Sequence, residues 1–205
     1  GDLSVKGGIG WALDHSGPGI ATLDVPQRAT ITNMGAELGA TTSIFPSDEQ
    51  TLAYLVQQGR ESYFQELSPD ADACYDDTLT LNLSELEPLI ARPDSPDNVC
   101  SITEVLGTPV NQVAIGSCTN SSFSDLMAVA SALRGKTIHP NVNMVVSPGS
   151  KQVLQLIAEN GALADMIAAG VVQIRPTCDE LVILADQFVV LLHVACGTVS
   201  KLTGC

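Results

Sequence analysis

Two cysteines, Cys118 and Cys178, each follow a short apolar run in the second half of the chain. A thiolate acts as a nucleophile or as a soft ligand for metals such as iron. No motif places His15, His139 or His193 beside Cys118, so a cysteine–histidine hydrolase has little support. A zinc site has less, because the chain has neither Cys-x-x-Cys nor a close histidine pair. An iron–sulfur cluster, which needs a third thiolate, stays open, and so does an inert buried cysteine.

A second pair of candidates, Asn33 and Glu37, lies in the first half of the chain. The two residues are four positions apart, so on a helix they share one face. Glycines and alanines between positions 35 and 40 have almost no side chain, which permits close approach of a backbone, a ligand or a cofactor. The alternative is a helix that packs tightly through these small residues and leaves Glu37 exposed.

Strands alternating with helices are predicted to position the two cysteines. Apolar runs indicate strands at 113–115, 142–146 and 171–174, and helical patterns follow at 122–135, 153–158 and 162–168. These βα repeats in the second half are typical of an α/β fold with a parallel sheet, whose ligands bind beyond the carboxyl ends of the strands. The loops that leave those ends span 116–122, 147–150 and 176–180. Cys118 and Cys178 are therefore expected on one rim of the sheet.

The first half of the sequence contains fewer patterns that predict helices or strands. Ser47 and Gln50 have the spacing of a capping box, and the apolar residues after them predict a helix over about 48–58. Residues 78–83 alternate apolar and polar side chains, as a half-buried strand does. The acidic stretch 70–77 lacks the glycine and terminal glutamate of a calcium loop, so a solvated loop is expected. Prolines and turn formers make 91–98 a linker or surface loop that divides the chain into 1–98 and 99–205.

Composition excludes several classes of partner. The 205 residues include 9 basic and 23 acidic side chains, a formal charge of −14, which disfavours binding to nucleic acid or anionic lipid. The apolar stretch 181–196 is shorter than the roughly 20 residues that cross a bilayer, so a buried strand or helix is expected there. Six widely spread cysteines fit a reducing, cytoplasmic compartment. The first residues show no signal peptide and no initiator Met, so a fragment of a longer chain is also expected.

Five segments, taken in order, resemble motifs of the aconitase family of hydro-lyases: 5–8, 16–19, 28–46, 116–122 and 147–150. The resemblance implies aconitase-type sheets, parallel or mixed, flanked by helices. It also implies a [4Fe-4S] cluster held by three cysteines. In such enzymes the cluster acts as a Lewis acid on a small tricarboxylate or hydroxy-dicarboxylate, so that water leaves and returns across a carbon–carbon double bond.

The resemblance assigns roles to four residues. Cys118 and Cys178 match cluster ligands, while Asn33 and Glu37 match residues that line the cluster and substrate site. Leu181 stands where the third thiolate is expected, and this puts the cluster in question. In this scheme 1–98 is a first- and second-domain segment, and 99–205 is the cluster-binding domain, with an atypical tail from 179. The family's upstream Asp-Ser-His segment and C-terminal swivelling domain are missing, so other parts must complete the enzyme in cis or in trans and this chain alone is expected to be inactive.

Three functional readings follow from the resemblance. The form of the segment 33–37 favours an aconitase of tricarboxylic acid metabolism, which interconverts citrate and isocitrate through cis-aconitate. An isopropylmalate dehydratase or homoaconitase large subunit is the alternative within the family. Leu181 favours a third reading, in which the chain is a non-catalytic, cluster-free α/β domain or a truncated product.

Overall fold

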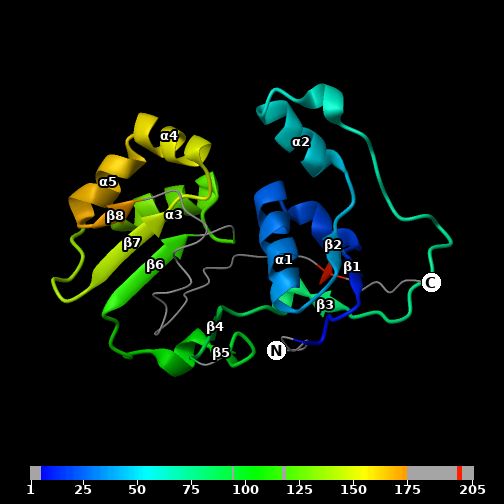
Figure 1. Cartoon of the computed structure of the whole chain (residues 1–205), viewed down its shortest axis with the longest axis horizontal. Helices are drawn as coiled ribbons and strands as arrows, with labels where there is room; N and C mark the ends of the chain where they lie inside the picture. The colour runs from blue at the N-terminus through cyan, green and yellow to red at the C-terminus, as the bar shows by residue number, and fades with distance from the viewer. Residues whose placement is uncertain (1–5, 94, 117–118, 175–197, 200–205) are drawn as a thin grey trace. The chain divides into compact units, whose positions relative to one another are not determined.

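The computed structural model describes residues 6–93, 95–116, 119–174 and 198–199, and the chain divides into two compact units. Unit 1 comprises Gly1–Glu87 with His193–Cys205, and unit 2 comprises Pro88–Leu192. Helices and small sheets, parallel and antiparallel, make up the chain (Figure 1). The predicted α/β class is therefore confirmed, while the division into family domains between residues 98 and 99 stays a prediction.

Unit 1 is built around a parallel pair of strands and one helix. Strand β1 (Ala12–Asp14) pairs with β2 (Thr42–Ile44), with Leu13 opposite Ser43. Between them lie a 3-10 helix, η1 (Pro18–Thr22), and the helix α1 (Val25–Glu37), which packs against β2. A capping box between Asp24 and Gln27 fixes the start of α1. This βαβ arrangement is the frame that carries Asn33 and Glu37.

The rest of unit 1 consists of short elements, and two local predictions fail there. The elements are α2 (Glu49–Gln57), η2 (Glu61–Tyr63), β3 (Leu81–Asn82), η3 (Leu83–Glu85) and β9 (Thr198–Val199), which pairs with β3. Helix α2 confirms the prediction, but its N-cap is Asp48 and not Ser47, because the Asp48 carboxylate accepts the first backbone N–H groups. The predicted strand at 78–83 is reduced to β3, since β9 supplies a partner for only two residues. The acidic stretch 70–77 is an exposed loop, as expected.

Unit 2 begins with a hairpin. Strand β4 (Leu89–Ala91) pairs antiparallel with β5 (Val99–Ser101), and a 3-10 helix, η4 (Ile102–Val105), follows. The segment predicted as a linker or surface loop therefore connects the two strands of this hairpin. Of the two predicted alternatives, a linker or a surface loop, this segment is the surface loop. The boundary between the units lies before the hairpin, at Glu87.

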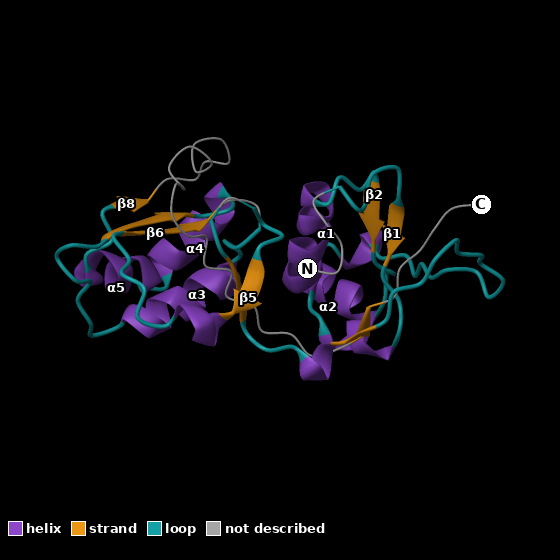
Figure 2. Cartoon of the chain, turned by 90° about the horizontal axis from the view of Figure 1, so that it is seen from below, coloured by secondary structure: helices purple, strands orange, loops and turns teal. Residues whose placement is uncertain are grey.

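The remainder of unit 2 shows the predicted βα repeats. Strands β6 (Gln112–Gly116), β7 (Asn143–Ser147) and β8 (Gln173–Ile174) form a parallel sheet in the order β6-β7-β8. Helices α3 (Phe123–Leu133), α4 (Lys151–Glu159) and α5 (Ala162–Ala169) connect the strands and pack on one another, and Figure 2 shows α3 and α5 on one side of the sheet. Their contact face contains the fully buried Leu126, Ile157 and Met166. Ser122 and Asp125 form the capping box of α3.

Candidate functional site

The rotation of α1 about its axis decides where Asn33 and Glu37 point. Arg28 and Gly35 are the buried residues of α1, and their separation of seven residues, about two helical turns, puts both on one face. Positions 33 and 37 lie roughly 200° around the helix from Gly35. Asn33 is half-buried and Glu37 is exposed. The helix therefore holds this amide and this carboxylate together on the face opposite its buried side.

Gly35 allows α1 to approach β2 closely. A Cβ atom at Gly35 would lie 3.2 Å from the Cβ of Ser43 and 3.5 Å from its Oγ. The contact between the two Cβ atoms would be tighter than packed side chains usually make. The structure thus shows that this small residue serves close helix–strand packing, the alternative raised for the glycines and alanines around it.

Arg28 binds α1 to the segments on either side of it. Its side chain is buried, and its five N–H donors make five hydrogen bonds. Three go to the carbonyl oxygens of Leu23, Pro46 and Ile20, at 3.0, 3.2 and 2.9 Å. Two go to the Asp48 carboxylate at 2.8 and 2.7 Å. One guanidinium thereby joins η1, α1, the end of β2 and the start of α2.

The surroundings of Asp48 keep its carboxyl group in the charged form that the contact with Arg28 requires. Burial by itself would raise the pKa of the Asp48 carboxyl. The hydrogen bonds and positive charge of Arg28, with the backbone N–H groups of Thr51 and Gln50, outweigh burial and hold that pKa below its usual value. Asp48 therefore stays ionised at neutral pH, as both the ion pair and the helix cap require.

His15 lies buried beside this network. His15 is the residue directly after β1 and is 7% exposed. Its ring stacks on that of Phe45, with the ring centroids 4.4 Å apart and an interplanar angle of 16°. The imidazole Nε2 lies 2.9 Å from the Oγ of Ser43. Burial lowers the pKa of His15 to about 4, so the ring is neutral at neutral pH. Phe45 also contacts the Arg28 guanidinium, 5.6 Å from the ring centroid.

The carboxyl ends of the unit 2 strands form the second candidate region. Gly116 lies opposite Ser147, and Val146 lies opposite Ile174, so the three parallel strands end at one edge. The loops that leave β6 and β7 are joined there, because the Gly149 N–H donates to the carbonyl of Ser121 at 3.2 Å. Cys118, Cys178 and Leu181 themselves lie outside the described residues. The strands that precede both cysteines nevertheless end at the same edge, as the predicted rim requires.

Gly116 is required where β6 reaches this edge. A Cβ atom at this position would lie 2.6 Å from both the Cβ and the carbonyl oxygen of Ser147. Side chains do not approach a neighbouring strand so closely. A residue without a side chain is therefore needed immediately before the segment that contains Cys118.

The positions that match the family motifs lack one thiolate for a three-cysteine cluster. Cys118 and Cys178 supply two thiolates, and the side chain of Leu181 has no atom that binds iron. Cys74, in an exposed loop, and Cys100, half-buried in β5, are free thiols. Within the described ranges, no group of three or more His, Cys, Asp or Glu side chains is placed to hold a metal ion. Cys196 and Cys205 lie outside those ranges.

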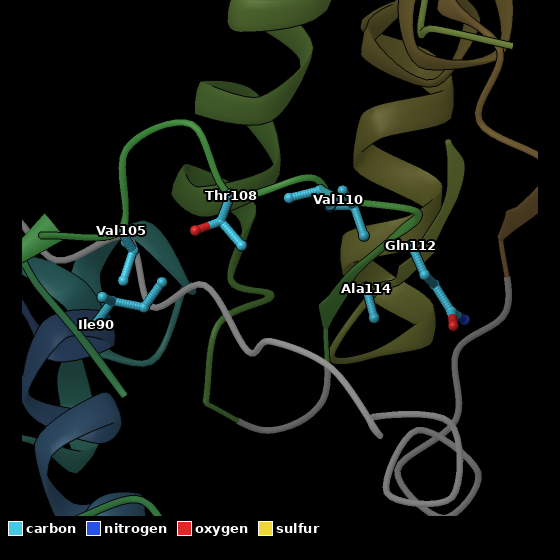
Figure 3. A pocket seen from close by; sticks show the side chains of 7 residues that line it. Ile90, Val105, Thr108, Val110, Gln112 and Ala114 are labelled. Carbon is cyan, nitrogen blue, oxygen red and sulfur yellow. The ribbon is translucent and has the colours of Figure 1, made fainter. Parts of the chain in front are cut away.

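A small apolar pocket in unit 2 offers no catalytic chemistry. It has a volume of about 80 Å³ and is lined by Ile90, Val105, Thr108, Val110, Gln112, Val113 and Ala114 (Figure 3). None of these side chains titrates, so the pocket lacks an acid or base. It also lies along the start of β6, away from Gly116, where the strand ends.

Sequence reasoning missed the residues that orient α1. The spacing of Arg28 and Gly35 was a usable signal, since two unusual helix residues seven apart share a face. His15 and Asp48 gave no such signal, because their partners lie 28 and 20 residues away in the sequence.

As for membranes, no helix in the described part of the chain is long and apolar enough to span one, and the stretch 181–196 falls outside that part.

Comparison with known proteins gives consistent matches. The model of the aconitase family (aconitate hydratase) matches residues 1–109 and 103–187. The 3-isopropylmalate dehydratase large subunit 2 of Archaeoglobus fulgidus is 39% identical, over 91% of this chain and 46% of that protein. The corresponding subunit of Rubrobacter xylanophilus is also 39% identical, over 86% and 42%. The 2,3-dimethylmalate dehydratase large subunit of Eubacterium barkeri is 38% identical, over 87% and 42%. The chain thus spans less than half the length of these relatives.

Proposed function

The chain belongs to the aconitase family, and from this premise we propose that it is part of a hydro-lyase acting on an alkyl-substituted malate. The observation that carries the proposal is the match to large subunits named for 3-isopropylmalate and 2,3-dimethylmalate dehydration. Both compounds are hydroxy-dicarboxylates with an alkyl substituent. These relatives favour the isopropylmalate-type alternative over the citrate–isocitrate substrate that the form of residues 33–37 suggested.

The proposed reaction removes a hydroxyl group from one carbon and a proton from its neighbour, so that water and an unsaturated dicarboxylate are formed. Glu37 is the proposed residue for the proton, because its carboxylate is exposed at the end of α1. Asn33, one turn away on the same face, is proposed to orient the substrate through its amide. The buried face of α1, which contains Arg28 and Gly35, holds this pair in place.

Cys118 and Cys178 are the proposed ligands of an iron–sulfur group, on the strength of the family motifs that they match. The family's cluster supplies a Lewis acid for the departing hydroxyl. Leu181 leaves the set of three thiolates incomplete in this chain. We therefore assign no step of the reaction to a cluster.

A separate small subunit is the proposed partner. The relatives are named as large subunits, and the chain covers less than half of each. A complete enzyme then needs residues supplied from outside this chain. The sequence likewise predicts that the missing parts of the enzyme are supplied in cis or in trans.

The first experiment measures iron and acid-labile sulfide after anaerobic reconstitution of the chain, with the absorption spectrum. About four of each per chain, lost in Cys118→Ala, supports the ligand assignment and requires a third ligand other than Leu181. Cys74→Ala is the matched control, because it removes an exposed thiol from a loop. Equal loading of Cys118→Ala would show that the ligand assignment is wrong.

The second experiment tests the substrate. The reconstituted chain is mixed with a small subunit of a 3-isopropylmalate dehydratase, and formation of the unsaturated product is followed from 3-isopropylmalate, 2,3-dimethylmalate and citrate. Turnover of the malates and not of citrate is expected, with loss in Glu37→Gln. Glu61→Gln changes another exposed carboxylate of unit 1 and serves as the control. Turnover of citrate alone would reject the substrate class.

A cluster-free, non-catalytic domain is the second candidate. The observation that favours it is the leucine at position 181. In addition, among the residues that the structure describes, no group of three or more His, Cys, Asp or Glu side chains is placed to hold a metal ion. Absence of bound iron after reconstitution, with an unchanged fold by circular dichroism, is the result that this candidate predicts.

A further inference from the structure

His15 is placed to act on the helix that carries Asn33 and Glu37, although it lies outside that helix. Its backbone N–H donates to the carbonyl of Ile44 at 2.9 Å and so extends the pairing of β1 and β2 by one residue. Its Nε2 lies 2.9 Å from the Oγ of Ser43. Ser43 is also the residue against which Gly35 of α1 packs. The imidazole, the Ser43 hydroxyl and the buried face of α1 therefore form one continuous contact.

We propose that His15 is a positioning residue that acts through Ser43. The neutral imidazole fixes the Ser43 hydroxyl beneath Gly35 and thereby holds α1 in the rotation that presents Asn33 and Glu37. This inference rests on the proposed function for the importance of Asn33 and Glu37, but its geometry is independent of any cluster or substrate.

The environment of the ring favours a single protonation state. Nδ1 is buried and has no hydrogen-bond partner among the described residues. A buried N–H without an acceptor is rarer in proteins than an unsatisfied acceptor, so the proton belongs on Nε2, which then donates to Ser43. A second proton would bury an N–H at Nδ1 with nothing to receive it. The ring therefore holds the Ser43 hydroxyl best in its neutral form.

Within the part of the chain that the structure describes, the charged groups around His15 do not supply an acceptor for Nδ1. Asp14 precedes it on β1, and burial raises the pKa of that carboxyl, against the effect of its hydrogen bond to the His15 N–H. Tyr75 interacts with Asp14. From α1 comes Arg28, whose charge is paired with Asp48 at the start of α2. Strand β2 and helix η1 carry no titratable side chain.

The first test is nuclear magnetic resonance of the 205-residue chain with labelled histidine nitrogens, in the absence of iron. The His15 signals, assigned by their loss in His15→Phe, are expected to show a neutral ring with the proton on Nε2 at pH 7. Protonation is expected at about pH 4, well below the 6.5 of an unperturbed histidine. A proton on Nδ1, or a midpoint near 6.5, would overturn the inference.

The second test measures whether loss of the hydrogen bond between His15 and Ser43 speeds amide hydrogen exchange in α1. Amide hydrogen exchange of residues 32–37 is expected to rise about tenfold in both His15→Phe and Ser43→Ala, while α3 in unit 2 is unchanged. The phenyl ring keeps the stacking on Phe45, so the change isolates the hydrogen bond. His139→Phe, at an exposed site in unit 2, is the control. Unchanged exchange of α1 in both variants contradicts the inference, whereas failure of iron binding or turnover contradicts only the proposed function.

Discussion

At the scale of single residues, the buried side chain of Arg28 fixes the orientation of α1. In most helices a stripe of apolar side chains fixes the orientation. Helix α1 is oriented by a buried arginine and a glycine, and Arg28 satisfies all five of its donors in the process. A buried arginine is tolerated because Asp48 and three carbonyls replace the water that it loses. The rotation of α1, and with it the positions of Asn33 and Glu37, therefore depends on a polar contact.

Arg28→Lys is expected to lower the free energy of unfolding of unit 1 by about 3 kcal/mol. Lysine keeps the charge but has a single nitrogen, which cannot replace the forked contact with Asp48 and reach three carbonyls. Denaturant unfolding followed by the fluorescence of Trp11, the one tryptophan of the chain, measures the change. The control is Arg60→Lys, since Arg60 is exposed and contacts the ring of Tyr63. Equal small effects of both substitutions would contradict the assigned role of Arg28.

The pH dependence of stability is expected to follow His15 and then Asp48. The pKa of His15 in the folded chain, about 4, lies below its unfolded value, so its contribution is fully present above about pH 6.5 and is lost as pH falls toward 4. The loss amounts to roughly 3 kcal/mol. The lowered pKa of Asp48 adds a further loss below about pH 4.

The comparison of wild type with His15→Phe isolates this histidine, because Asp14, whose raised pKa acts in the opposite direction, is present in both. Unfolding free energies measured from pH 7 to pH 4.5 are expected to fall more steeply in the wild type. Parallel curves would show that His15 binds protons equally in the folded and unfolded chain.

At the scale of elements, the edge of the unit 2 sheet depends on close contact between strands. Strands β6 and β7 end side by side, with Gly116 opposite Ser147, and their loops are joined by the hydrogen bond from Gly149 to Ser121. Ser122 and Ser150 then begin α3 and α4 through their side-chain caps. Two strand-to-helix connections are thus fixed at the edge where the cysteine-containing loops begin.

Gly116→Ala is expected to destabilise unit 2 by about 2 kcal/mol or more, because the new Cβ would overlap the backbone of β7. Far-ultraviolet circular dichroism during urea unfolding measures the loss. Gly107→Ala is a suitable comparison, since a Cβ there meets no atom within 4 Å and the cost is limited to its positive φ of 82°. A smaller effect at Gly116 than at Gly107 would mean that the two strands are farther apart than described.

At the scale of the whole molecule, charge restricts what the chain can bind. Its formal charge is −14, and it has only 9 basic residues. Arg28, Arg92 and Arg134 each form an ion pair with a carboxylate. A surface with so few available cations suits small-molecule and protein partners better than polyanions.

The chain is expected to show no binding to duplex DNA or to anionic lipid vesicles at about 0.15 M salt, where screening still leaves cationic patches effective. Fluorescence anisotropy with labelled DNA and vesicle sedimentation measure this. Binding in the micromolar range that weakens with added salt would reveal a basic surface and contradict the expectation.

The sequence by itself determined the features that contiguous residues specify. The βα repeats of unit 2, the helix over about 48–58 and the family motifs each depend on periodicity or spacing within a short segment. Roles for Asn33, Glu37, Cys118 and Cys178 came with those motifs and stay proposals.

Only the tertiary structure decided which face of α1 is buried, that Asp48 replaces Ser47 as a helix cap, and that strand 78–83 shrinks to two residues. Each outcome depends on a partner far away in the chain, as with Arg28 and Asp48, 20 residues apart, or His15 and Ser43, 28 apart. Local propensity contains no information about such pairs, because their free energy comes from burial and hydrogen bonds that exist only after the segments have packed together.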